Sequence, residues 1–540
     1  MIGIRQAPAE HRPRRLFWAL LPLLALAGRA LAEGIDLPNL PAPGTWREVF
    51  AYCQEMSAEF DADGRPIVVR RTIEPPPPLP PDAPPPSPFD PDAYAARVAS
   101  GGDETRAAAF LAWLEEEYSV PGETVLVAGT DPGGVFVLSE HGAAARALKR
   151  WDMASGRAEY LTPPDAPREL IAPVFRPAPD GSSSLAGLVW NDPGGARNEW
   201  LDPAFAAAEA RLEEAFPAAR FDWLHPDPSG TRWIVRAVRS DRPPVWLCVA
   251  PGGPAWQVLA ECPAEVSPTV RELFRWTASD GAAMTGIFTR PDAPGPFPLV
   301  VFPHGGPGSL STTDFDERVW ALADAGFAVF QPNYRGSSGL GKAFRLDGWG
   351  PAGIRRALLD IREGAAALLA DPAANLLPAP PVLLGGSWGG YLALAELAFF
   401  PGDWSGAVSF FGAFDLPALL RDELARVAAE LTPAEAARAR LSLLRQFGDP
   451  DSPSGMAALA GLSPALHPGA IRAPVLLFHN RADRVIPFAQ SVRMADALSS
   501  RPDPSPFLFV SADGIHGWSP EREAALYASL APLFRSWLAP

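Results

Sequence analysis

The pentapeptide Gly385-Gly386-Ser387-Trp388-Gly389 has the residue types and spacing that can make a serine nucleophilic. It follows an apolar stretch at 382–384 and precedes a helical pattern at 388–400. In a G-x-S-x-G turn the two outer glycines let strand and helix approach closely, and the strained serine is lifted clear of the sheet. We therefore predict that Ser387 is a nucleophile; the alternative is a purely structural glycine-rich turn.

A serine nucleophile needs a general base, and in this motif's usual chain order the acid and then the histidine follow the serine. His516 lies after the last apolar stretch, in a short loop with glycines on both sides. His467 and His479 also follow Ser387, but both lie ahead of the place expected for the acid. We predict that His516 is the base; the alternative is a loop histidine without a chemical role.

The acid should follow the penultimate strand, and Asp483 does so. It would accept the second imidazole N–H, fix the tautomer and stabilise the imidazolium. Asp449 and Asp451 are rivals, but they lie in a helical, proline-interrupted region without a preceding strand. Asp513 is only three residues from His516, where a hydrogen bond within the loop is favoured over a role as the acid.

The negative oxygen that forms during acyl transfer needs two fixed N–H donors. We predict that one is the Trp388 N–H, directly after the nucleophile. The other should come from the loop His304-Gly305-Gly306-Pro307-Gly308, in which we favour the Gly306 N–H because glycines leave the backbone uncovered. This chemistry requires no metal and no cofactor.

Beyond residue 270, short apolar runs alternate with helical patterns. Continuous apolar strands between helices predict an α/β fold, with a doubly wound, mostly parallel sheet covered on both faces, here an α/β-hydrolase domain. In such sheets the chemistry lies in loops beyond the carboxyl ends of the strands. The predicted strands are 299–302, 327–330, 382–384, 407–410, 475–478 and 507–510, and the helices 316–325, 354–370, 388–400, 487–499 and 521–537.

The preceding part of the chain has a β pattern, with short apolar stretches separated by Asp, Pro and Gly turns. These favour a propeller-like arrangement, interrupted by one helix at 205–216. We predict an N-terminal segment at 33–119 with a proline-rich linker at 75–91, a propeller-like β domain at 120–265 and the catalytic domain at 266–540.

Residues 1–32 have the order of a secretory signal peptide: basic residues, an apolar run, and then Ala30-Leu31-Ala32. The pair Arg14-Arg15 is also typical of twin-arginine export. We expect a periplasmic or secreted protein with no stable membrane insertion after the signal is removed. The alternative is a wrongly assigned start and a cytoplasmic protein.

Composition narrows the remaining possibilities. The chain has 540 residues, which is long enough for two or more domains, and its net charge of -16 argues against a nucleic-acid partner. None of the three cysteines has the CxxC spacing of a zinc or redox site. Cys248 and Cys262 could be paired or could be free thiols, and the sequence does not decide between them.

Taken in series, five sequence blocks resemble the prolyl oligopeptidase family of serine peptidases, particularly its acylaminoacyl-peptidase and dipeptidyl-aminopeptidase branches. The resemblance covers about residues 270–540. It implies a peptidase for short peptides, sheltered by an N-terminal β-propeller that excludes folded proteins. The blocks are His304-Gly305-Gly306-Pro307, Asn333 to Gly339, Gly385 to Tyr391, His479 to Pro487 with Gln490, and Ile515-His516-Gly517.

The chain departs from this family pattern in several ways. Residues 33–265 could hold only four or five of the family's seven or so blades, so the propeller is expected to be incomplete or open. Asn480 replaces a usual glycine, Leu340 and Trp388 replace usual tyrosines, and none of these changes removes a catalytic group. Glu115 to Glu117 superficially resemble a pair that holds a substrate amine, but a helix with an acidic outer face is favoured.

We therefore predict a serine peptidase that hydrolyses short peptides through an acyl-enzyme. A carboxylesterase-like enzyme acting on esters is the alternative within the same class, because the same triad acylates on either substrate. A non-catalytic binding protein is the alternative from another class, and the complete set of Ser387, Asp483 and His516 argues against it. The sequence predicts neither the preferred residue at the cleavage site nor the oligomeric state.

Overall fold

The structure, a computed structural model, describes residues 125–538 with short gaps, parts of 49–70, Phe110 and Trp113; the gaps after 125 are 132, 153, 167, 179–182, 193, 502–505 and 513. Four regions singled out in the sequence lie outside the described residues: the signal peptide, the proline-rich linker, Glu115 to Glu117, and Asp513.

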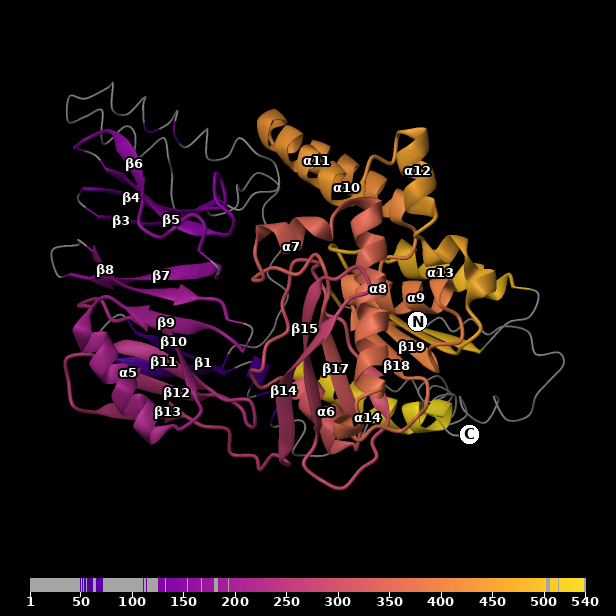
Figure 1. Cartoon of the computed structure of the whole chain (residues 1–540), viewed down its shortest axis with the longest axis horizontal. Coiled ribbons are helices and arrows are strands. Elements are labelled where there is room, and N and C mark those ends of the chain that lie inside the picture. The colour runs from indigo at the N-terminus through magenta and orange to yellow at the C-terminus, as the bar shows by residue number, and fades with distance from the viewer. Residues whose placement is uncertain are drawn as a thin grey trace.

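An eight-stranded mixed sheet forms the centre of the C-terminal part, in the order β14-β15-β17-β16-β18-β19-β20-β21 (Figure 1). β15 pairs antiparallel with both of its neighbours, and the strands from β17 to β21 are parallel. The predicted mostly parallel sheet is confirmed. The strands are β14 (Thr269–Thr277), β15 (Ala283–Pro291), β16 (Leu299–Val301), β17 (Ala328–Asn333), β18 (Val382–Gly386), β19 (Gly406–Phe410), β20 (Val475–Asn480) and β21 (Phe507–Ala512).

Helices cover both faces of this sheet because successive strand residues point to opposite sides. Val301 and Leu477 belong to the core beneath one set of helices, whereas their neighbours Val300 and Leu476 belong to the core beneath the other. The first set is α8 (Gly350–Leu369), α9 (Trp388–Phe399) and α13 (Ala489–Ser499), and the second is α6 (Glu317–Asp324) and α14 (Pro520–Leu538). These five helices were predicted, and the doubly wound arrangement is confirmed.

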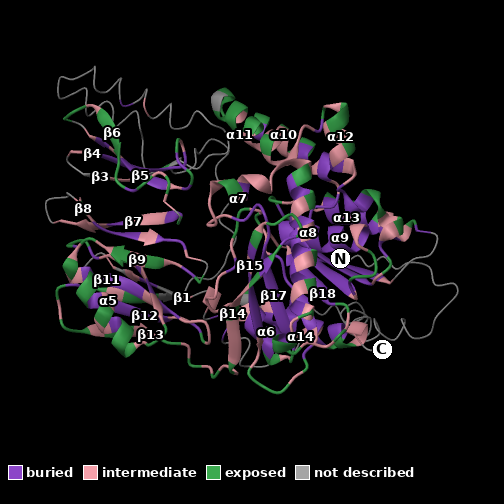
Figure 2. Ribbon diagram, in the orientation of Figure 1, coloured by how far each residue is buried: buried purple, intermediate pink, exposed green. Residues whose placement is uncertain are grey.

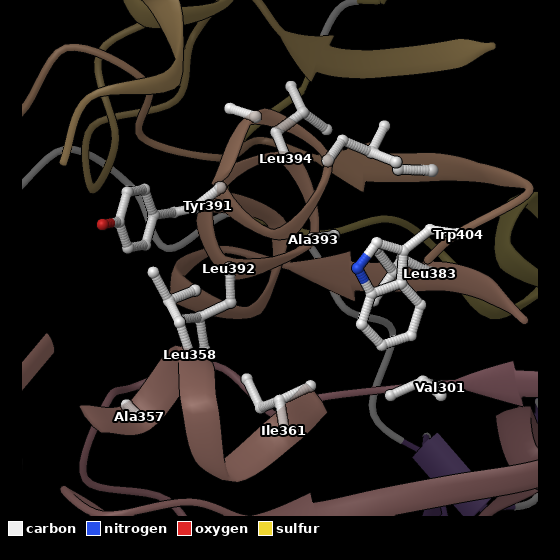
Figure 3. Packing of buried hydrophobic residues seen from close by; sticks show 14 of the residues in the cluster. Val301, Ala357, Leu358, Ile361, Leu383, Tyr391, Leu392, Ala393, Leu394 and Trp404 are labelled. Atoms are coloured by element: carbon white, nitrogen blue, oxygen red, sulfur yellow. The ribbon is translucent and has the colours of Figure 1, made fainter. Parts of the chain in front are cut away.

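The core under α8 and α9 is tightly filled. Figure 3 shows Leu358 and Ile361 of α8 close to Leu392 of α9, and all three belong to one buried cluster with Val301 and Leu383 of the sheet. Figure 2 shows the central strands almost wholly buried. A sheet packed on both sides in this way is a rigid platform for the loops at its edge.

Among the described residues of the C-terminal part, four further α-helices were not in the predicted set. α7 follows β17, and the other three lie between β19 and β20 at the top of Figure 1. Local caps start the latter: Asp415 and Ser452 accept backbone N–H groups, and Thr432 and Glu435 form a reciprocal capping box. The four are α7 (Lys342–Asp347), α10 (Leu416–Glu430), α11 (Pro433–Phe447) and α12 (Pro453–Ala460).

The preceding part of the chain is β-rich, as predicted. In the described residues it forms three antiparallel sheets of three or four strands, which succeed one another down the left of Figure 1, and a two-stranded sheet. The strands are β1 (Met56–Phe60) and β2 (Pro66–Arg70); β3 (Val125–Asp131), β4 (Gly134–Ser139), β5 (Ala147–Asp152) and β6 (Arg157–Tyr160); β7 (Leu170–Pro177), β8 (Ser183–Trp190) and β9 (Arg197–Trp200); and β10 (Arg220–Pro226), β11 (Trp233–Val238), β12 (Val245–Val249) and β13 (Trp256–Ala260).

The predicted helix at 205–216 is confirmed as α5 (Pro203–Ala215), which begins at the capping residue Asp202. Phe205 and Leu212 of α5 are buried against Trp233 and Val235 of β11. Each sheet pairs strands that are consecutive in the chain, which is the connectivity of a propeller blade. A propeller-like closure of the whole β-rich part remains a prediction.

The β-rich part contacts loops at the carboxyl edge of the large sheet. The Arg220 Nε donates to Asp314 Oδ1 over 2.7 Å, and the Thr313 hydroxyl donates to the Gly194 carbonyl over 2.6 Å. A second contact lies near α7, where Arg345 forms a buried ion pair with Glu140. These contacts place the β-rich part beside the edge where the predicted chemistry lies.

The structure shows no disulfide among Cys53, Cys248 and Cys262, so the pairing of Cys248 with Cys262 that the sequence left open is not formed. Cys248 is buried within β12, and burial raises the pKa of its thiol, so it behaves as an apolar core residue. Among the helices that the structure describes, none combines the length and apolar character needed to cross a membrane.

Candidate active site

The Ser387 turn joins β18 directly to α9. Ser387 has φ 57° and ψ −123°, a conformation that costs a non-glycine residue about 1–3 kcal/mol. Its N–H donates to the Phe410 carbonyl of the neighbouring β19 over 2.9 Å, and its carbonyl accepts the Tyr391 N–H of α9 over 3.1 Å. The surrounding strand and helix therefore hold the strained serine in place.

The glycines around Ser387 are needed for space. A Cβ on Gly385 would lie 2.2 Å from the Gly389 carbonyl oxygen, and a Cβ on Gly389 would lie 2.2 Å from the Pro303 carbonyl oxygen. Real Cβ atoms do not approach backbone atoms so closely, so a side chain at either position would force the backbone apart. The spacing of glycines around Ser387 therefore allows β18, α9 and the loop after β16 to pack closely together.

The loop after β16 lies against the serine turn. A Cβ on Gly305 would be 3.1 Å from the Gly386 oxygen and 3.9 Å from the Trp388 nitrogen. Gly306 follows with φ 119°, a left-handed conformation that favours glycine. The loop therefore packs against the serine turn and the first residue of α9, and the role of Gly306 and Trp388 as oxyanion donors remains a prediction.

His304 holds this loop in place through contacts with Ser337 and Tyr334. Its Nε2 lies 2.8 Å from the Ser337 hydroxyl, and its ring stacks on Tyr334 at 4.4 Å between centroids. The Tyr334 hydroxyl also donates to the His304 carbonyl over 2.8 Å. Burial lowers the pKa of His304 to about 4, so the ring is neutral at neutral pH. The sequence marked the 333–339 block as part of the family resemblance, and its structural role is to support the glycine loop.

His516 and Asp483 are brought together. The His516 Nδ1 lies 2.7 Å from Asp483 Oδ2, and the Asp483 side chain is fully buried. The other carboxylate oxygen accepts the N–H groups of Val485, over 2.8 Å, and Ile486, over 2.9 Å. Burial raises the pKa of Asp483, but the hydrogen bonds from His479, His516 and Ile486 outweigh it and leave the pKa well below its usual range. The carboxylate is therefore charged and oriented towards the imidazole.

His479 is a residue whose place the sequence did not reveal. It was set aside as a base because of its position in the chain, and the structure shows it beside the acid instead. Its Nε2 lies 3.0 Å from the Ile486 carbonyl and 3.4 Å from Asp483 Oδ2, and its Nδ1 lies 2.7 Å from the Ser491 hydroxyl. The only signal was its position in the block from His479 to Pro487 with Gln490, which is part of the family resemblance.

The rival residues have other partners. Asp449 accepts the Asp451 N–H over 3.0 Å in the turn before α12, and Asp451 forms a long, exposed ion pair with Arg421. His467 contacts the Ala460 carbonyl and the Phe399 ring. In the described residues none of these three hydrogen-bonds to His516, which favours Asp483 as the acid.

Ser387 and His516 line a single cavity of about 790 Å³. Phe411 forms part of its wall, with φ 41° and a ring centroid 4.3 Å from that of His516. A bulky residue in this region of φ is strained and is held only by its surroundings. Here the Phe411 N–H donates to the Phe478 carbonyl over 2.7 Å, which fixes the ring against the imidazole.

The far end of the cavity is lined by charged residues. Gln54 Nε2 lies 3.1 Å from Glu317 Oε1 and 2.9 Å from Glu523 Oε2 and joins the two carboxyl groups. Burial, opposed by Arg318, raises the pKa of Glu317 to about 7 and also raises that of Glu523. Arg318 pairs with Asp316. Apolar walls near Ser387 thus give way to a polar end.

The sheet order, the strained serine turn and the histidine–aspartate pair at the sheet's edge define an α/β-hydrolase fold, in which the Ser387, His516 and Asp483 triad remains a prediction. Comparison with known proteins narrows this class: residues 313–540 match the prolyl oligopeptidase family. The resemblance to the prolyl oligopeptidase family of serine peptidases that was inferred from the sequence is therefore confirmed for this part of the chain.

Two relatives show how far the similarity extends. The chain is 27% identical over 460 residues to dipeptidyl aminopeptidase BIII of Pseudoxanthomonas mexicana, covering 81% of this chain and 63% of that protein. It is 28% identical over 213 residues to the acylamino-acid-releasing enzyme of Sus scrofa, covering 38% of this chain and 26% of that protein. The chain thus spans less than two thirds of the length of these relatives.

Solved structures share the fold. A puromycin-hydrolyzing peptidase of Mycobacterium tuberculosis aligns with a TM-score of 0.57 and 23% identity, covering 77% of this chain and 60% of that one. The acylaminoacyl peptidase of Pyrococcus horikoshii aligns with a TM-score of 0.57 and 17% identity, covering 76% and 62%. At these identities the match supports the arrangement of an α/β-hydrolase domain with a β-rich domain before it.

Proposed function

We propose that this protein is a serine peptidase that hydrolyses short peptides, with Ser387 as nucleophile, His516 as general base and Asp483 as the acid that orients it. The observation that carries the proposal is the 2.7 Å contact between His516 Nδ1 and the buried Asp483, in a cavity that Ser387 also lines. Nδ1 is occupied by the carboxylate, so Nε2 is the nitrogen left to exchange a proton with the serine.

In the first half of the reaction, the Ser387 Oγ attacks the carbonyl carbon of the scissile amide as His516 Nε2 removes the hydroxyl proton. The carbonyl oxygen becomes negative, and the N–H groups of Gly306 and Trp388 stabilise it. The C–N bond then breaks, the imidazolium gives its proton to the departing amine, and an acyl-serine ester remains.

In the second half, water attacks the ester carbonyl while His516 Nε2 accepts one of its protons. The tetrahedral species collapses, the serine oxygen recovers that proton, and the carboxylic acid product leaves. Throughout both halves the charged Asp483 stabilises the imidazolium. The lowered pKa of Asp483 keeps the carboxylate ionised at neutral pH.

Short peptides are proposed as substrates on the strength of the relatives, which are named as a dipeptidyl aminopeptidase and an acylamino-acid-releasing enzyme. The cavity supports this choice because it is enclosed by both the serine turn and loops that the β-rich part contacts. Such a site suits an extended chain better than a folded surface.

The test uses purified full-length protein with three substrate types: an N-acetyl-aminoacyl peptide, a dipeptidyl substrate with a free amine, and a simple ester. We expect cleavage of at least one of the two peptide types and covalent labelling by a fluorophosphonate probe. Ser387→Ala should abolish both, because only the serine oxygen can form the covalent bond.

Ser499→Ala is the matched control, since the Ser499 hydroxyl only donates to the Ala495 carbonyl within α13. It should behave as wild type. Labelling that persists in Ser387→Ala would contradict the assignment of the nucleophile. Cleavage of the ester with no cleavage of either peptide would instead establish an esterase.

We further propose that the protein is exported to the periplasm or secreted, on the basis of the order of residues 1–32. The expected mature N-terminus is near Glu33, after Ala30-Leu31-Ala32. N-terminal sequencing of protein recovered from its native cell tests this, and an intact Met1 in the cytosolic fraction would overturn it.

A further inference from the structure

We propose that Asn480 is a positioning residue that holds the His516 loop in its reactive conformation; the proposal rests on the peptidase function above. Asn480 is the last residue of β20, is fully buried, and lies three residues before Asp483.

The Asn480 amide binds the backbone on both sides of His516. Its Nδ2 donates to the Ile515 carbonyl over 2.6 Å and to the Gly517 carbonyl over 2.8 Å. An amide NH₂ has two protons, and these two bonds use both. The peptide groups that flank the imidazole are therefore fixed by one buried side chain.

The third polar contact of Asn480 anchors the other end of the loop. Its Oδ1 accepts the indole N–H of Trp518 over 2.7 Å. The Trp518 ring packs at 5.1 Å from Phe410 and 5.9 Å from Phe478, measured between ring centroids, and both phenylalanines are buried strand residues. Asn480 thus links the loop to the rigid core of the sheet.

The loop needs such a clamp because it is built from flexible residues. Gly514 has φ 143° and Gly517 has φ 133°, and glycine restricts the backbone less than any other residue. Gly514 also leaves the room that Asn480 occupies, since a Cβ there would lie 3.2 Å from Asn480 Nδ2. Without the amide, the imidazole would be held only by its bond to Asp483, and its ring could exchange between orientations because its backbone is no longer restrained.

Asn480 also ties the base to the acid. Its carbonyl accepts the Asp483 N–H over 3.3 Å, while the adjacent Arg481 N–H donates to the Ala512 carbonyl over 2.8 Å. One residue therefore contacts the acid loop through its backbone and the base loop through its side chain. We infer that Asn480 fixes the angle at which His516 Nε2 meets the Ser387 hydroxyl, without touching substrate itself.

The test compares Asn480→Ala with the wild type in kcat, KM, fluorophosphonate labelling rate, and the proton NMR signal of the His516–Asp483 hydrogen bond. We expect kcat and labelling rate to fall about 100-fold, the typical cost of a misplaced catalytic group, with little change in KM. The downfield Nδ1 proton signal should broaden or disappear, because the ring exchanges between orientations.

Asn198→Ala is the matched control. Its Nδ2 also donates two hydrogen bonds, to Glu209 and to the Phe221 carbonyl, but these are partly buried and lie in the β-rich part. It should leave kcat and the NMR signal unchanged even if it lowers the melting temperature. A loss of kcat equal in both variants would show that Asn480 acts only through stability, and would overturn the proposal.

Trp518→Phe provides a second, milder variant, in case Asn480→Ala fails to fold. It keeps the aromatic packing and removes only the N–H that binds Asn480 Oδ1, so a smaller fall in kcat with the same sign is expected. The role is refuted if folded Asn480→Ala has the kcat, labelling rate and NMR signal of the wild type. If only Trp518→Phe folds, the same wild-type result in that variant refutes the role. That result would leave the proposed peptidase function intact. The proposed function fails on a different result, namely activity that remains in Ser387→Ala.

Discussion

At the scale of single residues, the site holds one side chain in its charged form and another in its neutral form. Asp483 receives hydrogen bonds on both oxygens and is kept ionised, whereas His304 is kept neutral by burial. The two groups have different tasks: the carboxylate must stabilise a positive imidazole, whereas the neutral His304 ring supports the glycine loop. Each task gives a distinct prediction.

Asp483→Asn should lower kcat by about four orders of magnitude, the loss seen when a triad acid becomes an amide and leaves the histidine in the wrong tautomer. The fold should survive, because an amide can retain the shape of the carboxyl group. Steady-state kinetics on a short peptide measure the effect. Asp449→Asn is the control; an inactive Asp449→Asn alongside an active Asp483→Asn would transfer the role to Asp449.

Because the pKa of His304 is lowered in the folded protein, the free energy of unfolding should decrease as the pH falls from about 6.5 to about 4. An unfolded chain protonates this histidine below about 6.5, whereas the folded protein does so only below about 4. The unfolded state therefore binds more protons in this window, and the free energy of unfolding decreases by up to about 3 kcal/mol. Denaturant unfolding at several pH values measures the slope.

His304→Gln should remove this contribution, since glutamine retains a polar side chain but does not titrate. The unfolding free energy of the variant should therefore change less than that of the wild type between pH 6.5 and 4. Identical slopes for the two proteins would show that His304 is not held neutral by burial.

At the scale of elements, the site depends on how closely β18, α9 and the loop after β16 approach one another. Gly389 lies on the first turn of α9 against that loop, and no side chain fits between them. A fraction of an ångström at this contact changes the distance between the serine oxygen and the oxyanion donors, which act only over hydrogen-bond distances.

Gly389→Ala should therefore lower activity by at least about 100-fold, because its Cβ would displace either the helix or the Pro303 carbonyl. The same Cβ should also destabilise the fold. Activity at a temperature well below the unfolding transition separates the two effects. Gly252→Ala, which adds a Cβ with nothing within 4 Å, should match the wild type; if both variants behave alike, the contact is unimportant.

At the scale of the whole molecule, the β-rich part and the catalytic domain meet around the site. The buried ion pair between Arg345 and Glu140 and the hydrogen bond from Arg220 to Asp314 both join loops of the large sheet to the β-rich part. Breaking a buried pair by removing one partner costs about 3–5 kcal/mol, so these contacts limit how freely the two parts separate.

This arrangement predicts selection by size: the full chain should cleave a short fluorogenic peptide and spare a folded protein. Only an extended chain can pass between the two parts and reach Ser387. The same protein substrate, unfolded beforehand, is the control and should be cleaved. Rapid cleavage of the folded substrate would show that the three described sheets leave the site open.

The sequence alone determined the parts of this protein that depend on local pattern. Apolar runs of strand length alternating with helical periods predicted the sheet and its five covering helices, because burial on both faces demands them. The motif around Ser387 and the chain order of Asp483 and His516 indicated the triad, because steric limits at the turn and the order of the strands constrain them.

Only the tertiary structure decided what depends on residues distant in the chain. His479 was set aside from its position yet lies beside Asp483, and Asn480 was noted only as a departure yet clamps the loop of His516. The sequence left the pairing of Cys248 and Cys262 equally open, and the structure shows no disulfide between them. Hydrogen bonds between loops depend on where two strands end in space, and no local pattern encodes that distance.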